Sequence, residues 1–271
     1  MEWRNFHALA FILGPTKGTL QKGIPTLAPP TFVWGKMAGK GTVELLKNAV
    51  VINASAKHTA TVIFLHGLGD TGDGWCSIWE QTKQPYVKLI CPTAPTMPVS
   101  VNGGHRMPSW FDIYSLGKDA RPDIEGIKSA SKKVHELLDF EIESTGVPPE
   151  RIIVGGFSQG GSLGLLAALT YPKRLAGILG LSCWLRNMEN ENLVDNITVN
   201  KNTPFLHCHG EADPVVPFEM GRLSAEFAKT FNETSYEFKP YPGLAHSSCP
   251  EELEYVQNWM DKLIPPSGGN I

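Results

Sequence analysis

Short apolar runs alternate along the chain with longer segments in which apolar residues recur every three or four positions. The short apolar runs, some of them rich in β-branched residues, indicate strands. They lie at residues 50–52, 59–65, 86–91, 151–157, 175–182, 204–209 and 235–241. The three-to-four-residue spacing indicates helices. These lie at residues 75–81, 124–146, 161–169, 217–231 and 250–264. The alternation predicts an α/β fold with a mostly parallel central sheet and helices on both faces.

Three segments lack a clean period. Residues 92–121 are rich in proline and glycine, and an irregular loop of this length in a compact domain predicts a functional role. Residues 1–48 combine scattered prolines and glycines with few acids, so we expect a disordered or poorly ordered extension. A transit peptide is the alternative, because the extension is basic. We expect a flexible tail at 267–271, which leaves one domain at 49–266.

Composition narrows the function classes. The 271 residues carry a net charge of −3 without a basic patch, which argues against nucleic acid as a partner. No apolar run is long enough to predict a membrane-spanning helix. The five cysteines show no C-x-x-C pairing and several lie in apolar strands, which favours reduced thiols and a cytoplasmic location. Metal-ligand spacings such as H-E-x-x-H are absent, so we expect no metal site.

The strand at 151–157 and the helix at 161–169 flank the sequence Gly156-Phe157-Ser158-Gln159-Gly160. Strand, sharp turn and helix form the context that a G-x-S-x-G nucleophile elbow requires. The flanking glycines permit the strained backbone of the turn, where a Cβ atom would clash. We therefore expect Ser158 to be a nucleophile at the carboxyl end of its strand. A glycine-rich packing turn is the alternative.

A serine nucleophile requires a base within hydrogen-bond reach and a carboxylate that orients the base. On this topology the carboxylate and then the histidine follow the serine along the chain. Asp213 follows the next-to-last predicted strand, with Glu211 as its rival and Asp195 in a loop without a preceding strand. His246 follows the last predicted strand. We predict that Asp213 and His246 complete a triad with Ser158.

The other histidines lack this context. His207 and His209 lie within or at the end of a strand, where core or structural histidines are common. His135 lies on the polar face of a helix, and His58 and His105 lie in loops. We therefore assign none of these side chains to the proton transfer.

An oxyanion hole needs two backbone N–H groups that point at the charge developing on the substrate oxygen. One comes from the residue after the nucleophile, which is Gln159 in this chain. The second comes from a loop after an early strand, and the sequence His66-Gly67-Leu68-Gly69 follows the strand at 59–65. We predict Leu68 as the second donor, with His66 and Asp70 holding the loop in place.

Five separated blocks resemble one family, the cytosolic acyl-protein thioesterases, also called lysophospholipases of the carboxylesterase type. The blocks are His66-Gly67-Leu68-Gly69-Asp70-Thr71-Gly72, Pro108-Ser109-Trp110-Phe111-Asp112, Gly155-Gly156-Phe157-Ser158-Gln159-Gly160-Gly161, Leu181-Ser182-Cys183-Trp184-Leu185 and His246-Ser247-Ser248-Cys249. The resemblance covers about residues 50–266 and implies an α/β-hydrolase fold that needs no cofactor. It implies hydrolysis of the thioester between palmitate and protein cysteines, with weaker activity on lysophospholipids and short acyl esters. It places the triad at Ser158, Asp213 and His246 and the oxyanion hole at Leu68 and Gln159.

The chain departs from this family at three places. Many vertebrate members carry a cysteine after the initiator methionine that can be lipidated, whereas this chain begins Met1-Glu2-Trp3. Arg186 stands where the family usually has proline, a difference that affects the expected rim of the substrate pocket and not the catalytic chemistry. Residues 1–48 have no counterpart. We expect S-acylated proteins and lysophospholipids or acyl esters as substrates, with transient contact to a membrane surface.

A palmitoyl chain requires an apolar channel. Trp184, Leu185, Met107 and Trp110 are the candidates to line it, and a place in the core is the alternative for each. A general carboxylesterase or lysophospholipase on the same triad is the alternative function. A third hypothesis is a lipid- or protein-binding relic of the fold without activity, against which the intact triad argues.

Overall fold

The computed structural model describes residues 43–115, 120–185, 193, 197, 199–232 and 234–267. Most of the predicted extension, most of the predicted tail and Arg186 lie outside the described residues. The described part starts before residue 49, and Glu44–Leu46 form a short 3-10 helix, η1. Leu45 and Leu46 are buried in the core, so the folded unit includes residues 43–48.

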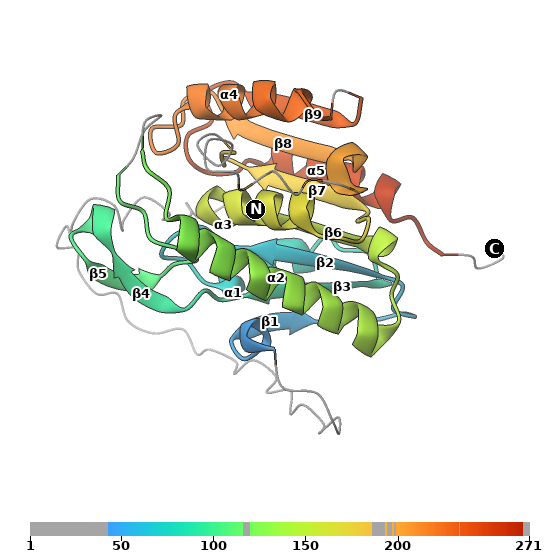
Figure 1. Cartoon of the computed structure of the whole chain (residues 1–271). Coiled ribbons are helices and arrows are strands. Elements are labelled where there is room, and N and C mark those ends of the chain that lie inside the picture. The colour runs from blue at the N-terminus through green and yellow to red at the C-terminus, as the bar shows by residue number, and fades with distance from the viewer. Residues whose placement is uncertain are drawn as a thin grey trace, which may run out of the picture.

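A seven-stranded sheet forms the centre of the described part of the chain (Figure 1). Its strands are β1 Ala49–Ile52, β2 Ala60–Leu65, β3 Val87–Pro92, β6 Ile152–Phe157, β7 Gly177–Leu181, β8 Phe205–Gly210 and β9 Tyr236–Tyr241. Their order across the sheet is β1-β3-β2-β6-β7-β8-β9. Only β1 and β3 pair antiparallel within this sheet of described residues, and the other neighbours are parallel. The mostly parallel sheet predicted from the sequence is confirmed.

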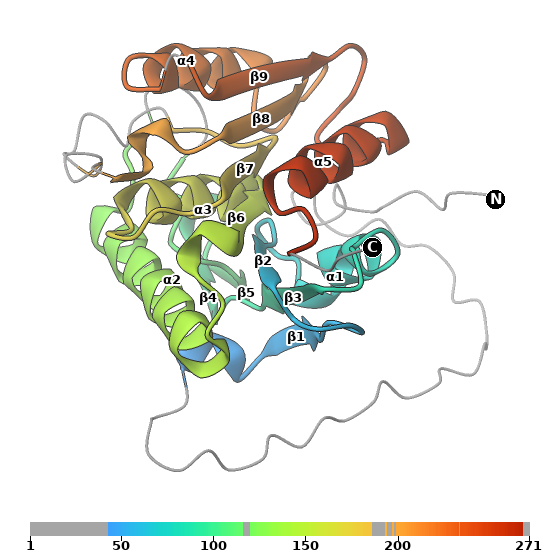
Figure 2. The ribbon, with the colours of Figure 1, turned by 90° about the vertical axis from the view of Figure 1, so that its right-hand side faces the viewer.

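Helices cover both faces of the sheet. They are α1 Gly72–Glu80, α2 Ile124–Thr145, α3 Ser158–Thr170, α4 Phe218–Lys229 and α5 Pro250–Leu263. Figure 2 shows α2, α3 and α4 on one face and α1 and α5 on the other. The predicted helices are confirmed, although α3 begins at Ser158 itself, three residues before the apolar period becomes visible. None of the helices within the described ranges is long and apolar enough to cross a membrane.

The two faces of the sheet form two hydrophobic cores. In β2, Ile63 and Leu65 pack into the core under α2, α3 and α4, whereas Val62 and Phe64 pack into the core under α1 and α5. Burial on both faces explains why the strands read as continuous apolar runs. Helix α3 is buried along all but its last residue, and after its polar first turn it is mostly apolar, as expected of a helix in such a place.

Residues 96–108 form a β-hairpin where the sequence predicted an irregular loop, and that prediction was wrong. β4 Thr96–Val99 pairs antiparallel with β5 His105–Pro108. Gly103 and Gly104 lie in the turn with φ of 64° and 79°, a region that glycine adopts without strain. A proline within each short strand interrupts the alternation by which strands are recognised.

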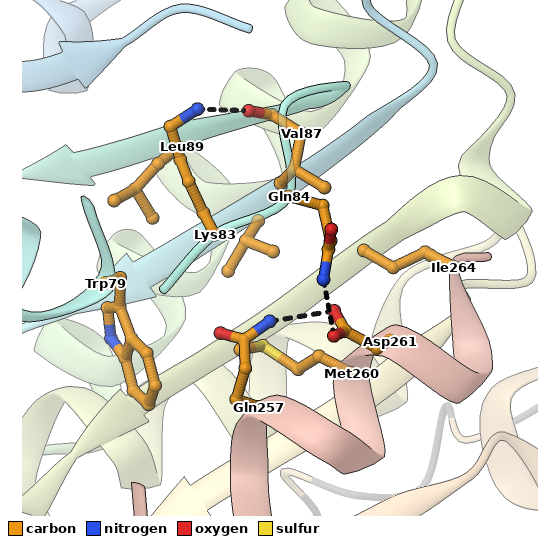
Figure 3. Close-up of a pocket in the computed structure, with 10 residues that line it drawn as sticks. Trp79, Lys83, Gln84, Val87, Leu89, Gln257, Met260, Asp261 and Ile264 are labelled. Atoms are coloured by element: carbon orange, nitrogen blue, oxygen red, sulfur yellow. Dashed lines mark hydrogen bonds between the residues drawn. The ribbon is translucent and has the colours of Figure 1, made fainter. Parts of the chain in front are cut away.

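A shallow pocket opens at the amino ends of β2 and β3, next to α1 and α5 (Figure 3). Its floor is apolar, with Trp79 and Met260 among the lining side chains. At its rim, Asp261 accepts hydrogen bonds from Gln84 Nε2 at 2.6 Å and from Gln257 Nε2 at 2.8 Å. The bond from Gln84 joins the loop after α1 to the end of α5, whereas the bond from Gln257 lies within α5.

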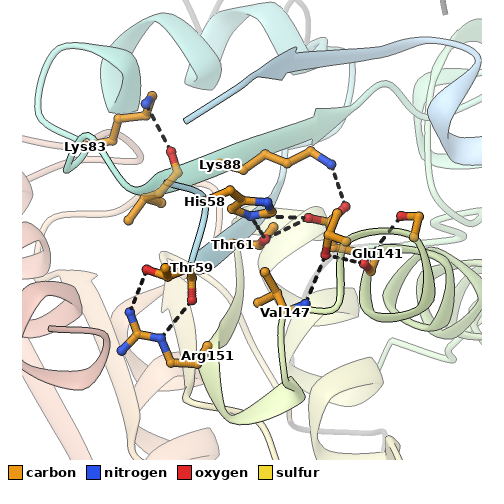
Figure 4. A network of polar contacts seen from close by, with 11 residues as sticks. His58, Thr59, Thr61, Lys83, Lys88, Glu141, Val147 and Arg151 are labelled. Carbon is orange, nitrogen blue, oxygen red and sulfur yellow. Dashed lines mark hydrogen bonds and ion pairs between the residues drawn. The ribbon is translucent and has the colours of Figure 1, made fainter. Parts of the chain in front are cut away.

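A buried polar cluster anchors α2 to β2 and β3 (Figure 4). Lys88 Nζ donates to Glu141 Oε2 at 2.6 Å, and Thr61 Oγ1 donates to Glu141 Oε1 at 2.8 Å. Because the Thr61 proton points to the carboxylate, the same hydroxyl accepts from His58 Nε2 at 2.9 Å. Both oxygens of the buried Glu141 carboxylate therefore have partners, which is the condition for tolerating a buried charge.

Candidate active site

Ser158 follows β6 directly and is the first residue of α3. Its φ of 53° lies in the left-handed region that non-glycine residues rarely adopt. Gly156 and Gly160 make this turn possible, because a Cβ at either position would lie 2.6 Å or closer to main-chain atoms. The backbone strain expected of a nucleophile elbow is present at Ser158, at the carboxyl edge of the sheet.

Three predicted site residues lie in contact at this edge. His246 Nε2 lies 3.0 Å from Ser158 Oγ, and His246 Nδ1 lies 2.7 Å from Asp213 Oδ2. An ionised carboxylate only accepts hydrogen bonds, so Nδ1 carries the imidazole proton. Nε2 is then the acceptor for the Ser158 hydroxyl. All three side chains are buried, so the contacts lie in a region of reduced solvent screening.

Asp213 lies in a tight turn after β8. Its Oδ1 accepts the backbone N–H of Val215 at 2.8 Å and that of Val216 at 2.9 Å. These two bonds leave Oδ2 directed at His246. The rival Glu211 is exposed, and Asp195 lies outside the described residues.

His246 lies in the loop between β9 and α5. Gly243, with φ of 70°, lets the chain turn back after the strand. The ring of Phe157, the residue before Ser158, packs against the imidazole with ring centroids 4.7 Å apart. The contact with Phe157 and a hydrogen bond at each nitrogen define the orientation of His246.

The loop that carries Leu68 is held by His66. The N–H of Ala94 donates to His66 Nε2 at 3.0 Å, so Nδ1 carries the proton and donates to the Gly67 carbonyl at 2.7 Å. Burial lowers the pKa of His66, which favours this neutral form. Asp70 Oδ1 accepts from the N–H of Thr71 at 2.7 Å. Both contacts agree with the loop-holding roles predicted for His66 and Asp70.

Gln159 is in the first turn of α3, where a backbone N–H has no acceptor one turn back in the helix. Its side chain has a role that the sequence did not reveal. Nε2 donates to Ser109 Oγ at 2.9 Å and to the Phe111 carbonyl at 2.8 Å, while Oε1 accepts from the N–H of Trp110 at 3.1 Å. A single amide thus joins the nucleophile helix to the segment after the hairpin.

The four candidates for the acyl channel fall into two groups. Trp110 and Leu185 are buried in the core, and the indole N–H of Trp110 donates to the His66 carbonyl at 2.8 Å. Met107 and Trp184 are partly exposed. Met107 lies beside the predicted oxyanion loop, since a Cβ at Gly69 would be 3.7 Å from its Sδ. Met107 and Trp184 are therefore the two candidates that remain accessible to a ligand.

Two further histidines, His207 and His209, are buried near the carboxyl end of β8. Burial and the neighbouring His209 lower the pKa of His207 to about 3, and its Nδ1 lies 2.9 Å from the Tyr236 hydroxyl. His209 lies beside Asp213, with Nε2 3.7 Å from Oδ2. The sequence placed both in the core, and it did not reveal the contact between His209 and the acid.

The pocket between α1 and α5 lies at the opposite edge of the sheet from Ser158. Val62 lines it at the start of β2, whereas the pair Leu65 and Gly156 marks the end that leads to Ser158. We therefore do not assign an acyl substrate to this pocket. Within the described ranges, no three His, Cys, Asp or Glu side chains are grouped so that they could hold a metal ion.

Comparison with known sequences gives consistent matches. The profile of the phospholipase/carboxylesterase family matches residues 46–264. Acyl-protein thioesterase 1 of Gibberella zeae is 49% identical over 227 residues, which cover 80% of this chain and 96% of that protein. Acyl-protein thioesterase 1 of Neurospora crassa is 41% identical over 226 residues, which cover 80% of this chain and 91% of that protein.

Solved structures show the same similarity. The crystal structure of Zea mays acyl-protein thioesterase 2 superposes with a TM-score of 0.72 at 33% sequence identity, covering 80% of this chain and 99% of that one. The structure of Arabidopsis thaliana SOBER1 superposes with a TM-score of 0.70 at 36% identity, covering 76% of this chain and 99% of that one.

Proposed function

Because the chain belongs to the phospholipase/carboxylesterase family of α/β-hydrolases, we propose that it is a serine hydrolase that removes palmitate from S-acylated proteins through Ser158, Asp213 and His246. The observation that carries the proposal is the continuous contact from Asp213 through His246 to a serine in a strained elbow. The names of the similar proteins support the thioester as the bond that is cleaved.

Acylation begins with proton transfer from Ser158 to His246. Over the 3.0 Å contact, Nε2 accepts the hydroxyl proton while Oγ attacks the acyl carbonyl carbon. The N–H groups of Leu68 and Gln159 stabilise the oxyanion. The C–S bond then breaks, and the departing thiol takes the proton from Nε2. The acyl group remains on Ser158 as an ester.

Deacylation repeats the proton transfer with water. His246 Nε2 accepts a proton from a water molecule as its oxygen attacks the acyl-serine carbonyl. The tetrahedral intermediate collapses, the fatty acid leaves, and Ser158 Oγ recovers the proton from Nε2. Asp213 keeps the imidazole in the required tautomer throughout, through the 2.7 Å contact with Nδ1. The cycle needs no cofactor.

A fluorophosphonate probe tests the nucleophile. The wild-type chain should be labelled on Ser158, and Ser158→Ala should abolish labelling. Ser162→Ala, one helical turn along α3, should retain it and serves as the matched control. Labelling of Ser158→Ala at the wild-type rate would overturn the proposed nucleophile.

A substrate comparison tests the thioesterase activity. We expect kcat/KM to be higher for a palmitoylated peptide than for lysophosphatidylcholine or a short-chain ester. The family description supports a general carboxylesterase or lysophospholipase as the second candidate. Preference for either oxygen ester, with labelling of Ser158 intact, would favour that candidate and overturn only the substrate assignment.

The proposed compartment is the cytoplasm, where the enzyme would contact acylated proteins at a membrane surface transiently. The cysteines of the chain are free thiols, a state that reducing compartments maintain. Fractionation of cells that express the full chain tests this assignment. Recovery in an organelle fraction, with a shortened amino terminus, would favour the transit-peptide alternative.

A further inference from the structure

His209 makes one strong hydrogen bond beside the acid of the proposed triad. It is the next-to-last residue of β8, and its side chain is fully buried. Nε2 lies 2.8 Å from the Val216 carbonyl oxygen and 3.7 Å from Asp213 Oδ2. A carbonyl oxygen only accepts hydrogen bonds, so Nε2 carries the proton and donates it to Val216.

Val216 connects this histidine to the carboxylate. The N–H of Val216 donates to Asp213 Oδ1 at 2.9 Å, and Oδ2 of the same carboxylate faces His246 Nδ1 at 2.7 Å. The carbonyl of Val216 is held by His209, while its N–H holds Asp213. His209 therefore fixes the turn that orients the carboxylate toward His246.

Helix α4 holds the imidazole of His209 from the other side. A Cβ at Gly221 would lie 2.5 Å from His209 Nδ1, so glycine lets α4 approach the ring this closely. Phe218 contacts the ring edge to face, with centroids 6.0 Å apart. Nδ1 has no hydrogen-bond partner among the described residues. The ring is thus oriented by its packing and by the single bond to Val216.

The neutral form of His209 suits this place. Burial lowers the pKa of His209, so the ring is uncharged near neutral pH. A charged ring 3.7 Å from Asp213 Oδ2 would compete with His246 for the carboxylate. A neutral imidazole supplies the donor for the Val216 carbonyl without this competition.

We propose that His209 is a positioning residue, which acts on Asp213 through the peptide groups of Val216. The inference rests on the proposed function, because it requires Asp213 to orient His246 during catalysis. Without the donor, the buried Val216 carbonyl loses its partner and the turn relaxes. Asp213 Oδ2 then no longer holds the imidazole at the angle that proton transfer needs.

Two substitutions separate the hydrogen bond from the packing. His209→Gln supplies an uncharged N–H near the position of Nε2, whereas His209→Leu fills the space without a donor. We expect His209→Leu to lower kcat roughly 10- to 100-fold, as expected for a misplaced catalytic group, with KM changed less than about threefold. His209→Gln should keep kcat within about threefold of wild type.

His207 offers a matched control. It is buried on the same strand two residues earlier, and its ring contacts that of His209 with centroids 5.7 Å apart, but its hydrogen bond goes to Tyr236 and not to the turn. His207→Leu should lower Tm without lowering kcat. Gly221→Ala displaces the His209 ring by steric contact and should lower kcat, which provides a second route if His209→Leu does not fold.

The outcomes distinguish the positioning role from the triad itself. Wild-type kcat in both His209→Leu and Gly221→Ala, an equal loss in His209→Gln, or an equal loss in His207→Leu would overturn the proposal. Asp213→Ala is assayed beside them. Retained activity in Asp213→Ala would overturn the triad, whereas its loss with wild-type activity in both His209→Leu and Gly221→Ala would overturn only the role of His209.

Discussion

Ser158 and Ser182 directly follow neighbouring strands, and both have an unusual positive φ, of 53° and 46°. They follow Phe157 and Leu181, which are paired in register across β6 and β7. For Ser158 this geometry presents the hydroxyl to His246. Ser182 is fully buried, and its hydroxyl has no hydrogen-bond partner in the described part of the chain. The strained backbone at Ser182 is therefore not accompanied by a hydrogen bond of its side chain.

Ser182→Gly should raise the free energy of unfolding by about 1 kcal/mol. Glycine relieves the left-handed strain of about 1–2 kcal/mol, and part of this gain is offset by the greater freedom of the unfolded chain. Ser182→Ala removes the hydroxyl but keeps the strain, so it should gain less. Urea denaturation measures both variants, and a glycine variant less stable than the alanine variant would contradict strain at this position.

The meeting of Ser158, Asp213 and His246 could be predicted because each follows a strand in a defined chain order. The roles of the Gln159 amide and of His209 could not. Gln159 bonds to residues 109–111, some 50 positions earlier, and no local pattern encodes that pairing. The core placement expected for His209 was correct, but its contact with Asp213 depends on the shape of the turn after β8.

At the scale of elements, one buried ion pair holds the 22-residue helix α2 against the sheet. Lys88→Met should lower the free energy of unfolding by about 3–5 kcal/mol, because the buried Glu141 carboxylate loses its cation. The double variant Lys88→Met with Glu141→Leu should recover most of this loss, since no charge is then buried. Urea denaturation of the single and double variants measures both effects.

An exposed ion pair between the same helix and the loop after α3 provides the control. Lys173 Nζ lies 2.7 Å from Asp139 Oδ1, with the two side chains 43% and 47% exposed. Lys173→Met should change the free energy of unfolding by less than about 1 kcal/mol. Equal losses of unfolding free energy in Lys88→Met and Lys173→Met would show that the buried ion pair of Glu141 stabilises the fold no more than the exposed pair.

Strands and helices with a clean apolar period could be placed to within a few residues. The hairpin β4–β5 could not, because Pro98 and Pro108 interrupt the alternation in strands of only four residues. The adjacent glycines Gly103 and Gly104 were the available signal, since such a pair between short strands is typical of a hairpin turn. A strand or helix can therefore be predicted from the sequence only when its own residues show a clear apolar period.

At the scale of the molecule, the order of the strands could not be predicted. β2 lies between β3 and β6, and the edge strand β1 runs antiparallel to β3. The sequence of connections determines neither the place of β2 in the sheet nor the direction of β1. A crossover helix can lead to the position on either side of the preceding strand. The meeting of the candidate site residues at one edge of the sheet could be predicted all the same, since it depends only on parallel strands ending there.

The stability of the whole molecule should depend on pH through Glu252. This residue of α5 is fully buried and bonds to Ser248 through one oxygen, while the other has no partner among the described residues. Burial raises the pKa of Glu252 from 4.5 to about 7. The folded state therefore keeps a proton that the unfolded chain releases. This contribution is complete below about pH 4.5 and is lost as the pH rises through 7.

Glu252→Gln removes this titration. Its stability relative to wild type should increase between pH 5 and pH 8 by up to about 3 kcal/mol. Urea denaturation at the two pH values measures the change. Glu251→Gln, an exposed neighbour on the same helix, controls for the loss of one charge. A constant difference between Glu252→Gln and wild type across this range would contradict the expectation.

The chain order of the proposed triad has a consequence for biosynthesis. Ser158 follows β6 near the middle of the chain, whereas His246 follows the last strand. A ribosome therefore completes the serine elbow long before it makes the base. Nascent chains that stall ahead of residue 246 lack the His246 imidazole that would accept the serine proton, so esterase activity should arise only in the final stage of translation.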